Sequence, residues 1–260
     1  MVKASKKAPL NANNNLKFSL FLGFRTNSAY QRWWEARKIW GEIINNSRTF
    51  ARQVLQFGKP LEVQSLRHQI IERQLAWNWF LAYRLRNLGW TKEGETRLPK
   101  NAIDTLKKAD HKPNLLLLEQ EKDLNLLVQH KAIDDFYFRS ADATLKELCD
   151  SMGKCERIKK TVFPTQYSLF TLVFINMFLI LLPLGLTDTL GYYTIPIQVA
   201  IGFTFGMIQN ISESMQNPFD NKPNDIPIFA ISRTIERDLL EIIEEKNLPS
   251  PIKANQGILM

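Results

Sequence analysis

Residues 161 to 187 carry no charged side chain, and this run limits the possible folds more than any other feature. Its core, YSLFTLVFINMFLILLPLGL, holds about 20 residues, which as a helix cover about 30 Å, the thickness of the hydrocarbon layer of a membrane. Helices buried inside soluble proteins are rarely apolar for so long. The run therefore predicts a membrane span, with a buried core helix as the alternative.

A second uncharged run extends from Thr189 to Ser212, after a short connection around Asp188. It contains more polar side chains, such as Gln198, and polar groups in a span usually face other helices rather than lipid. Gly202 and Gly206 form a GxxxG pair, which permits close helix contact but is weak evidence alone. The two runs together predict a transmembrane helical hairpin.

The charges that flank the hairpin, which we place at residues 161–212, predict its orientation. Four basic residues crowd its start, whereas the connection between the spans carries only Asp188. Basic residues favour the cytoplasmic side of a span. Residues 32–160 and 213–260 are therefore expected in the cytoplasm, as a helical region and a C-terminal segment. The four basic residues are Lys154, Arg157, Lys159 and Lys160.

The opening part of the chain predicts one long helix that leaves an apolar environment. Residues 16–31 include an apolar run, and large apolar side chains then recur at steps of about three and four. At the change from apolar to polar sequence lies a collar of cationic and aromatic residues, as is typical of a helix leaving a bilayer. A soluble amphipathic helix with buried Trp residues is the alternative. Residues 1–15 are polar and predict a disordered tail. The collar consists of Arg25, Arg32, Trp33 and Trp34.

The remaining sequence also has helical periodicity. Helices are expected over 61–87, 115–128 and 132–149, with a polar loop or short broken helices over 89–113. Alternation with period two does not extend over any useful length. The predicted fold class is all-α: a membrane protein with an apolar helical hairpin, a long opening helix and a cytoplasmic helical bundle.

Neither an enzyme nor a metal or cofactor site is predicted. The three histidines, His68, His111 and His130, lie on separate elements without the spacing of metal ligands. Cys149 and Cys155 are read as reduced thiols in the cytoplasm. The net charge of +8 alone would also suit a nucleic-acid binder, but the basic residues are dispersed and no nucleic-acid-binding motif is present.

Three blocks of sequence resemble the bestrophin family of pentameric ion channels, in particular its bacterial branch. The first is FLGFRTNSAY followed by RWWEAR, over residues 21–37. The second contains Asn217, Pro218 and Phe219, and the third begins at Cys155. In animal members, acids after the Asn-Pro-Phe motif help bind calcium. This chain keeps only two acids there, with a lysine between them, so calcium gating is not expected.

The resemblance implies that Leu16, Leu20 and Phe24 form the narrow hydrophobic neck of a central pore. These residues recur every four positions and so share one helix face, and an apolar constriction gates ions by dewetting. The family has another apolar span upstream, which residues 1–15 do not supply, so this chain is expected to lack the N-terminal transmembrane helix.

The expected function is therefore a subunit of an oligomeric ion channel, of the chloride or anion channel family, with its ion selectivity open. The expected partners are other copies of the chain in a homopentamer, the lipid bilayer and small inorganic ions. The expected location is the bacterial inner membrane, in a multi-pass topology. The alternatives are a non-conducting truncated homologue and a helical membrane-associated scaffold.

Overall fold

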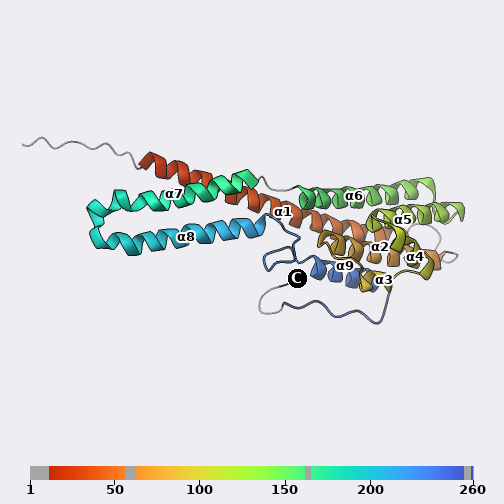
Figure 1. The fold of residues 1–260 in the computed structure, drawn as a ribbon. Helices are drawn as coiled ribbons and strands as arrows, with labels where there is room; N and C mark the ends of the chain where they lie inside the picture. Colours follow the sequence, from red (N-terminus) through yellow and green to blue (C-terminus); the bar gives the residue numbers. More distant parts are fainter. Residues whose placement is uncertain (1–11, 57–62, 162–164, 255–258, 260) are drawn as a thin grey trace, which may run out of the picture. The chain divides into compact units, whose positions relative to one another are not determined.

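The computed structural model describes residues 12–56, 63–161, 165–254 and 259 (Figure 1). Throughout these residues the regular structure is helical, without strands, which confirms the all-α prediction. Residues 1–11 of the predicted tail lie outside the described residues, and residues 12–15 belong to the first helix.

Helix α1 (Ala12–Gln56) is a single helix of 45 residues and begins four positions before the predicted start at residue 16. It contains no proline, and Gly23 and Gly41 are its only glycines. Since isolated glycines weaken a helix but do not break it, nothing in the sequence interrupts α1 between its apolar start and its polar end.

The chain divides into two compact units. The first contains the chain up to Trp33 and residues 162–216, and the second contains residues 34–161 and 217–260. The units change after residues 33, 161 and 216, whereas the sequence places the corresponding limits after residues 31, 160 and 212. Helix α1 contributes to both units.

The first unit contains the hairpin of α7 (Thr165–Leu190) and α8 (Thr194–Met215). The short 3-10 helix η1 (Gly191–Tyr193) connects them, and Gly191 has a φ of 50°, a conformation that glycine adopts without steric cost. The connection is shorter than the sequence indicates, because α7 continues through Asp188 and ends only at Leu190. The two helices contact each other, and the rings of Phe178 and Phe205 meet edge to face at 5.7 Å.

A proline in α7 leaves one backbone carbonyl of that helix without its helical donor, and a side chain of α8 supplies the missing hydrogen bond. Pro183 has no N–H, so it cannot donate to the carbonyl of Leu179 one turn earlier. Gln198 Nε2 of α8 donates to that carbonyl at 2.6 Å. Of the two GxxxG glycines, Gly202 lies against α7, since a Cβ there would be 3.6 Å from Leu179 Cδ1, whereas Gly206 has open space. One glycine and one glutamine thus position α8 against the same turn of α7.

The second unit is built around α2 (Gln64–Leu85), in which every residue from Gln74 to Ala82 is buried. A helix that is buried all round must be enclosed by other elements. The elements that contact α2 are α3 (Lys92–Glu95), α5 (Lys112–Gln129), α6 (Asp135–Lys160) and α9 (Ile228–Ile242). The second part of α1 reaches α2 through a hydrogen bond of 3.0 Å from Gln74 Nε2 to Ser47 Oγ.

Several elements of this unit differ from the sequence prediction. Helix α6 continues to Lys160, because only Gly153 intervenes after the predicted end at residue 149 and it does not break the helix. Pro113 was predicted in a loop, but it lies in the first turn of α5, where its missing N–H has no helical acceptor. The region 89–113, expected as a polar loop or short broken helices, contains the short helices α3 and α4 (Lys100–Lys108), which agrees with the second of these alternatives.

We predict that Gln198→Leu destabilises the hairpin by about 1 kcal/mol, because it leaves the Leu179 carbonyl without its partner in an apolar setting. In a Pro183→Ala background, the new backbone N–H can donate to that carbonyl, so the same substitution should cost much less. Thermal unfolding of the single and double variants in detergent measures this coupling. Thr204→Val is the control, since the Thr204 hydroxyl bonds only within its own helix, to Ala200. Equal costs of Gln198→Leu in both backgrounds would contradict the bridging role.

Candidate functional site: the apolar hairpin, the collar and the motif loop

The hairpin exposes large apolar side chains along both helices. The stretch Leu169–Met215 is long and apolar enough, by length and composition, to cross a membrane, and only 11% of its most apolar window is buried. A core helix of a soluble protein would be mostly buried, so the low burial weighs against that alternative. The most exposed of these side chains are Leu169, Ile180, Leu184, Ile195, Val199 and Phe203.

The tip of the hairpin carries two adjacent tyrosines in η1. Tyr192 is 93% exposed and Tyr193 is 75% exposed. Tyrosine is enriched at the interface between lipid and water, where its ring contacts the apolar layer and its hydroxyl contacts water. The turn of a hairpin that crosses a membrane lies at this interface, and the two tyrosines are located at the turn.

The predicted pore residues lie on α1 in the first unit. Leu16, Leu20 and Phe24 all belong to this helix, but their side chains lie outside the described residues. The same holds for Arg25 of the collar. The assignment of a hydrophobic neck therefore stays a prediction.

The other three collar residues are described. Arg32 and Trp33 are half-buried, and the ring of Trp33 stacks on Tyr30 at 6.3 Å. Trp34 is 43% exposed. Because consecutive helical residues point about 100° apart, these side chains surround the helix instead of forming one face.

The sequence analysis missed a groove within the first unit, of about 650 Å³, between α1 and α8. The α1 side consists of the small or polar residues Gly23, Thr26 and Asn27 together with Tyr30. The α8 side is apolar and includes Phe205 and Ile208. The α1 residues follow helical spacing within the FLGFRTNSAY block, so the periodicity of this block could have indicated a common face.

The Asn-Pro-Phe motif anchors the segment after α8 to the second unit. Phe219 is completely buried and Pro218 is buried, whereas Asn217 is exposed. The carbonyl of Pro218 accepts a hydrogen bond of 3.1 Å from the N–H of Ile226, which closes residues 218–226 into a loop. In this chain the Pro and Phe of the motif therefore have a structural role.

Two cations from the bundle hold this motif loop. Lys159 Nζ lies 2.8 Å from Asp220 Oδ1. Arg86 donates to Asn221 and to the carbonyl of Ile226, and its guanidinium lies 4.1 Å from the ring centre of Phe229.

The other acid of the loop, Asp225, accepts from the backbone N–H of Lys222 at 3.1 Å, and burial raises the pKa of its carboxyl. Among the described residues, no group of three or more His, Cys, Asp or Glu side chains is placed to hold a metal ion. The loop acids instead make contacts within the protein.

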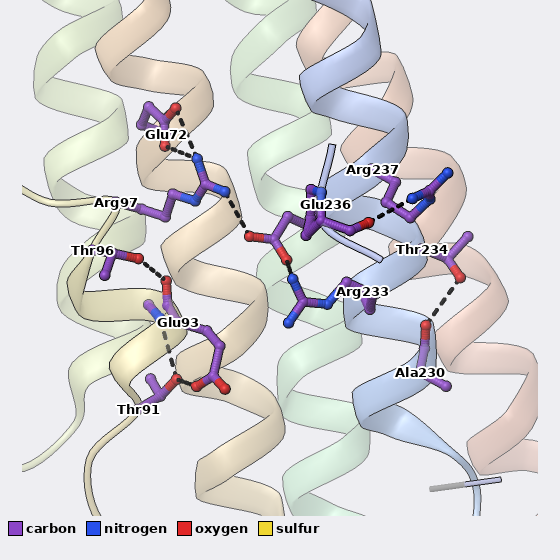
Figure 2. Close-up of polar contacts among 12 residues, drawn as sticks. Glu72, Thr91, Glu93, Thr96, Arg97, Ala230, Arg233, Thr234, Glu236 and Arg237 are labelled. Carbon is purple, nitrogen blue, oxygen red and sulfur yellow. Dashed lines mark hydrogen bonds and ion pairs between the residues drawn. The ribbon is translucent and has the colours of Figure 1, made fainter. Parts of the chain in front are cut away.

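A second polar network holds α9 against α2 (Figure 2). Arg97 bridges two carboxylates, with NH1 3.3 Å from Glu72 Oε2 and NH2 2.8 Å from Glu236 Oε1. Arg233 NH1 approaches the other oxygen of Glu236 at 2.8 Å, and its guanidinium lies 5.2 Å from the ring centre of Trp79. Arg233 and Glu236 lie three residues apart on α9. The pairing of Arg97 with Glu72 and Glu236 instead joins segments far apart in the chain, so no local pattern in the sequence indicated it.

A third network lies between α2 and α5. Arg73 NH1 is 3.0 Å from Asp123 Oδ2 and 3.6 Å from Glu119 Oε2. Burial raises the pKa of Asp123 to about 6, against the opposing effect of Arg73 and with a smaller contribution from Glu119. Gln120 Nε2 donates to Gln74 Oε1 at 2.8 Å on the same pair of helices.

The model of the family described as Bacterial/Fungal Bestrophin protein matches residues 10–241. The chain belongs to this family.

Relatives and solved structures agree with this bestrophin assignment. The chain is 31% identical over 233 residues to the voltage-dependent anion channel-forming protein YneE of Salmonella typhimurium, covering 89% of this chain and 75% of the relative. It is 27% identical over 244 residues to the voltage-dependent anion channel-forming protein RSc3414 of Ralstonia nicotianae, covering 94% and 80%. A crystal structure of a bacterial bestrophin homologue from Klebsiella pneumoniae has 30% identity and a TM-score of 0.83, covering 89% and 86% of the two chains. The relatives are named as channel-forming proteins, which agrees with the prediction that the chain is not an enzyme.

We predict that Asp123 makes the stability of the second unit depend on pH. In the folded protein its carboxyl has a pKa of about 6, above the usual value of 3.8. The folded state therefore binds this proton more tightly than the unfolded state does. The resulting stabilisation is complete below about pH 4 and is lost as the pH rises through about 6. The wild-type protein should therefore lose stability relative to Asp123→Asn as the pH rises from about 4 to about 6. The free energies of unfolding of the two proteins, measured across this range, test the prediction.

The control is Leu124→Ala, which changes a buried neighbour on the same helix without removing a titratable group. It should lower the stability by a similar amount at every pH, because its effect is the loss of apolar packing. Parallel stability curves for wild type and Asp123→Asn would contradict the role of Asp123.

Proposed function

We propose that this chain is a subunit of an anion channel of the bestrophin type. The observation that carries the proposal is the match, over 86–94% of the chain, to relatives named voltage-dependent anion channel-forming proteins. The outward-facing apolar side chains of α7 and α8 support it, because a channel subunit must contact lipid over such a surface.

The proposed conducting pathway runs past one face of the first part of α1. Leu16, Leu20 and Phe24 share this face, and their side chains would form an apolar neck that resists wetting. One helix cannot enclose a pore, so several copies of the chain must surround it. We propose a homopentamer, as the family resemblance implies.

The proposed location is the bacterial inner membrane, with α7 and α8 as spans. The basic end of α6 would lie in the cytoplasm, together with the helical bundle and the C-terminal segment. The connection of the hairpin, with Asp188 and the exposed Tyr192 and Tyr193, would lie on the opposite side.

The neck can be tested with the triple variant Leu16→Ala, Leu20→Ala and Phe24→Ala. Smaller side chains widen the tube and let water persist in it, so chloride flux into liposomes should rise above that of the wild type. If these residues instead belonged to a packed core, Phe24→Ala alone would cost about 3–5 kcal/mol. A destabilised protein without chloride flux would contradict the pore assignment.

The matched control for the neck is the pair Phe18→Ala and Leu22→Ala. These positions lie on the opposite side of the same helix, since each residue advances by about 100°. The control truncates one phenylalanine and one leucine, one leucine fewer than the triple variant, and should leave the chloride flux near that of the wild type. Equal increases in both variants would show that the effect does not depend on the proposed pore face.

The topology can be tested with a cysteine introduced at Thr189, which is exposed, in a Cys149→Ser background, where the remaining Cys155 is buried. An impermeant thiol reagent added to intact spheroplasts should label Thr189→Cys, because the connection is proposed to lie outside. Lys154→Cys in the same background should be protected until the cells are opened. Labelling of Lys154→Cys with protection of Thr189→Cys would invert the orientation.

A further inference from the structure

A basic cavity of about 360 Å³ lies within the second unit, where the ends of three helices meet. It is lined by the C-terminal end of α2, the N-terminal end of α5 and the C-terminal end of α6. Leu88, 42% exposed, and Pro113 add apolar surface to it. Its charged lining residues are Arg84, Asp110, Lys112, Glu156, Lys159 and Lys160.

The carboxylate of Glu156 is contacted by Arg84, His111 and Lys160. Arg84 Nε lies 2.7 Å from Glu156 Oε1, and His111 Nε2 lies 2.8 Å from the same oxygen. Lys160 Nζ is 3.8 Å from Glu156 Oε2 and its side chain is 71% exposed. Arg84 NH1 also donates to the carbonyl of Asp110 at 3.3 Å. One carboxylate thus offsets only part of the positive charge of Arg84 and Lys160.

Lys112 supplies further positive charge to the lining of the cavity. Its Nζ donates to the carbonyl of Ala109 at 3.2 Å, a neutral acceptor that leaves the charge of the ammonium group uncancelled. Lys112 is also the first residue of α5, a helix of 18 residues whose N-terminal end carries partial positive charge. Lys159 is paired with Asp220. Counting Asp220, the cavity has four cationic side chains against three carboxylates, with the helix terminus in addition.

The place of these residues in the chain indicates the kind of ligand. Lys159 and Lys160 end α6, five positions before α7 begins at Thr165. Lys154 and Arg157 precede them on the same helix, so four basic residues lie next to the start of a span. Such clusters on the cytoplasmic side of a span bind anionic lipid headgroups.

We propose that this cavity binds a phosphate group, and that the headgroup of an anionic phospholipid supplies it. Lys112 and Lys160 contact the phosphate oxygens, and Arg84 holds Glu156 to one side. The proposal requires the hairpin to lie in a membrane, but it does not require ion conduction. Lipid binding and chloride flux are separate measurements, so one can fail while the other succeeds.

The test uses the full chain purified in detergent, with phosphatidylglycerol as the probe and phosphatidylcholine as the uncharged comparison. Binding is measured by native mass spectrometry and by the shift of thermal unfolding. A parallel arm replaces the lipid by inorganic phosphate, against chloride at equal ionic strength. Phosphatidylglycerol binding without an effect of inorganic phosphate supports the whole proposal. An equal effect of inorganic phosphate supports the phosphate site but overturns the lipid headgroup as its source.

The pocket variant is Lys112→Gln with Lys160→Gln, and its matched control is Lys122→Gln with Lys146→Gln. The control also removes one positive charge from α5 and one from α6, at Lys122 and Lys146, whose side chains are 58% and 73% exposed. Affinity for phosphatidylglycerol should fall about thirtyfold in the pocket variant, since each basic residue near an anionic surface contributes a factor of about five. The control should bind like the wild type.

The conservative pair Lys112→Arg with Lys160→Arg keeps both charges and should keep the affinity, which separates loss of binding from loss of folding. Equal losses in the pocket and control variants would show diffuse attraction to the whole basic surface and would overturn the site. A wild-type protein that binds neither phosphatidylglycerol nor inorganic phosphate would overturn it as well.

Discussion

The uninterrupted backbone of α1 is the constraint on which the rest of the structure depends. Its 45 residues contribute to two units with different chemistry, an apolar hairpin unit up to Trp33 and a bundle with polar networks from Trp34 onward. Because the helix satisfies its own backbone hydrogen bonds, it can pass from an apolar to a polar environment without a break. The side chains change from apolar to cationic and aromatic along its length, while the backbone stays the same.

The two units satisfy their polar groups in different ways. In the hairpin, the carbonyl freed by Pro183 is met by one side chain, Gln198, because a buried carbonyl without a partner is costly in an apolar layer. In the bundle, pairing joins charges from distant segments, as Arg97 does between Glu72 and Glu236. These pairs hold α9 against α2.

In the motif loop, Phe219 is both part of a sequence motif typical of the family and a buried residue of the bundle. Phe219 is recognisable in the sequence because of its Asn-Pro-Phe context, and in the structure it is completely buried. Lys159 and Arg86 then fix the loop through Asp220 and Ile226. The same end of α6 that carries Lys159 also borders the basic cavity, so the anchoring of the loop and the proposed phosphate site use neighbouring residues.

The sequence by itself determined the all-α class, the apolar hairpin, the long opening helix and the family, because hydrophobic runs, helical periodicity and the block around Trp33 are local properties of the chain. It also contained a signal for α9, in the spacing of Ile231, Ile235 and Leu239, that was not used. Only the tertiary structure decided the partners of Asp123, Arg97 and Lys159, and the cavity at the helix ends. Those contacts join residues far apart in the chain, and no local pattern specifies which distant charge or helix end will be adjacent after folding.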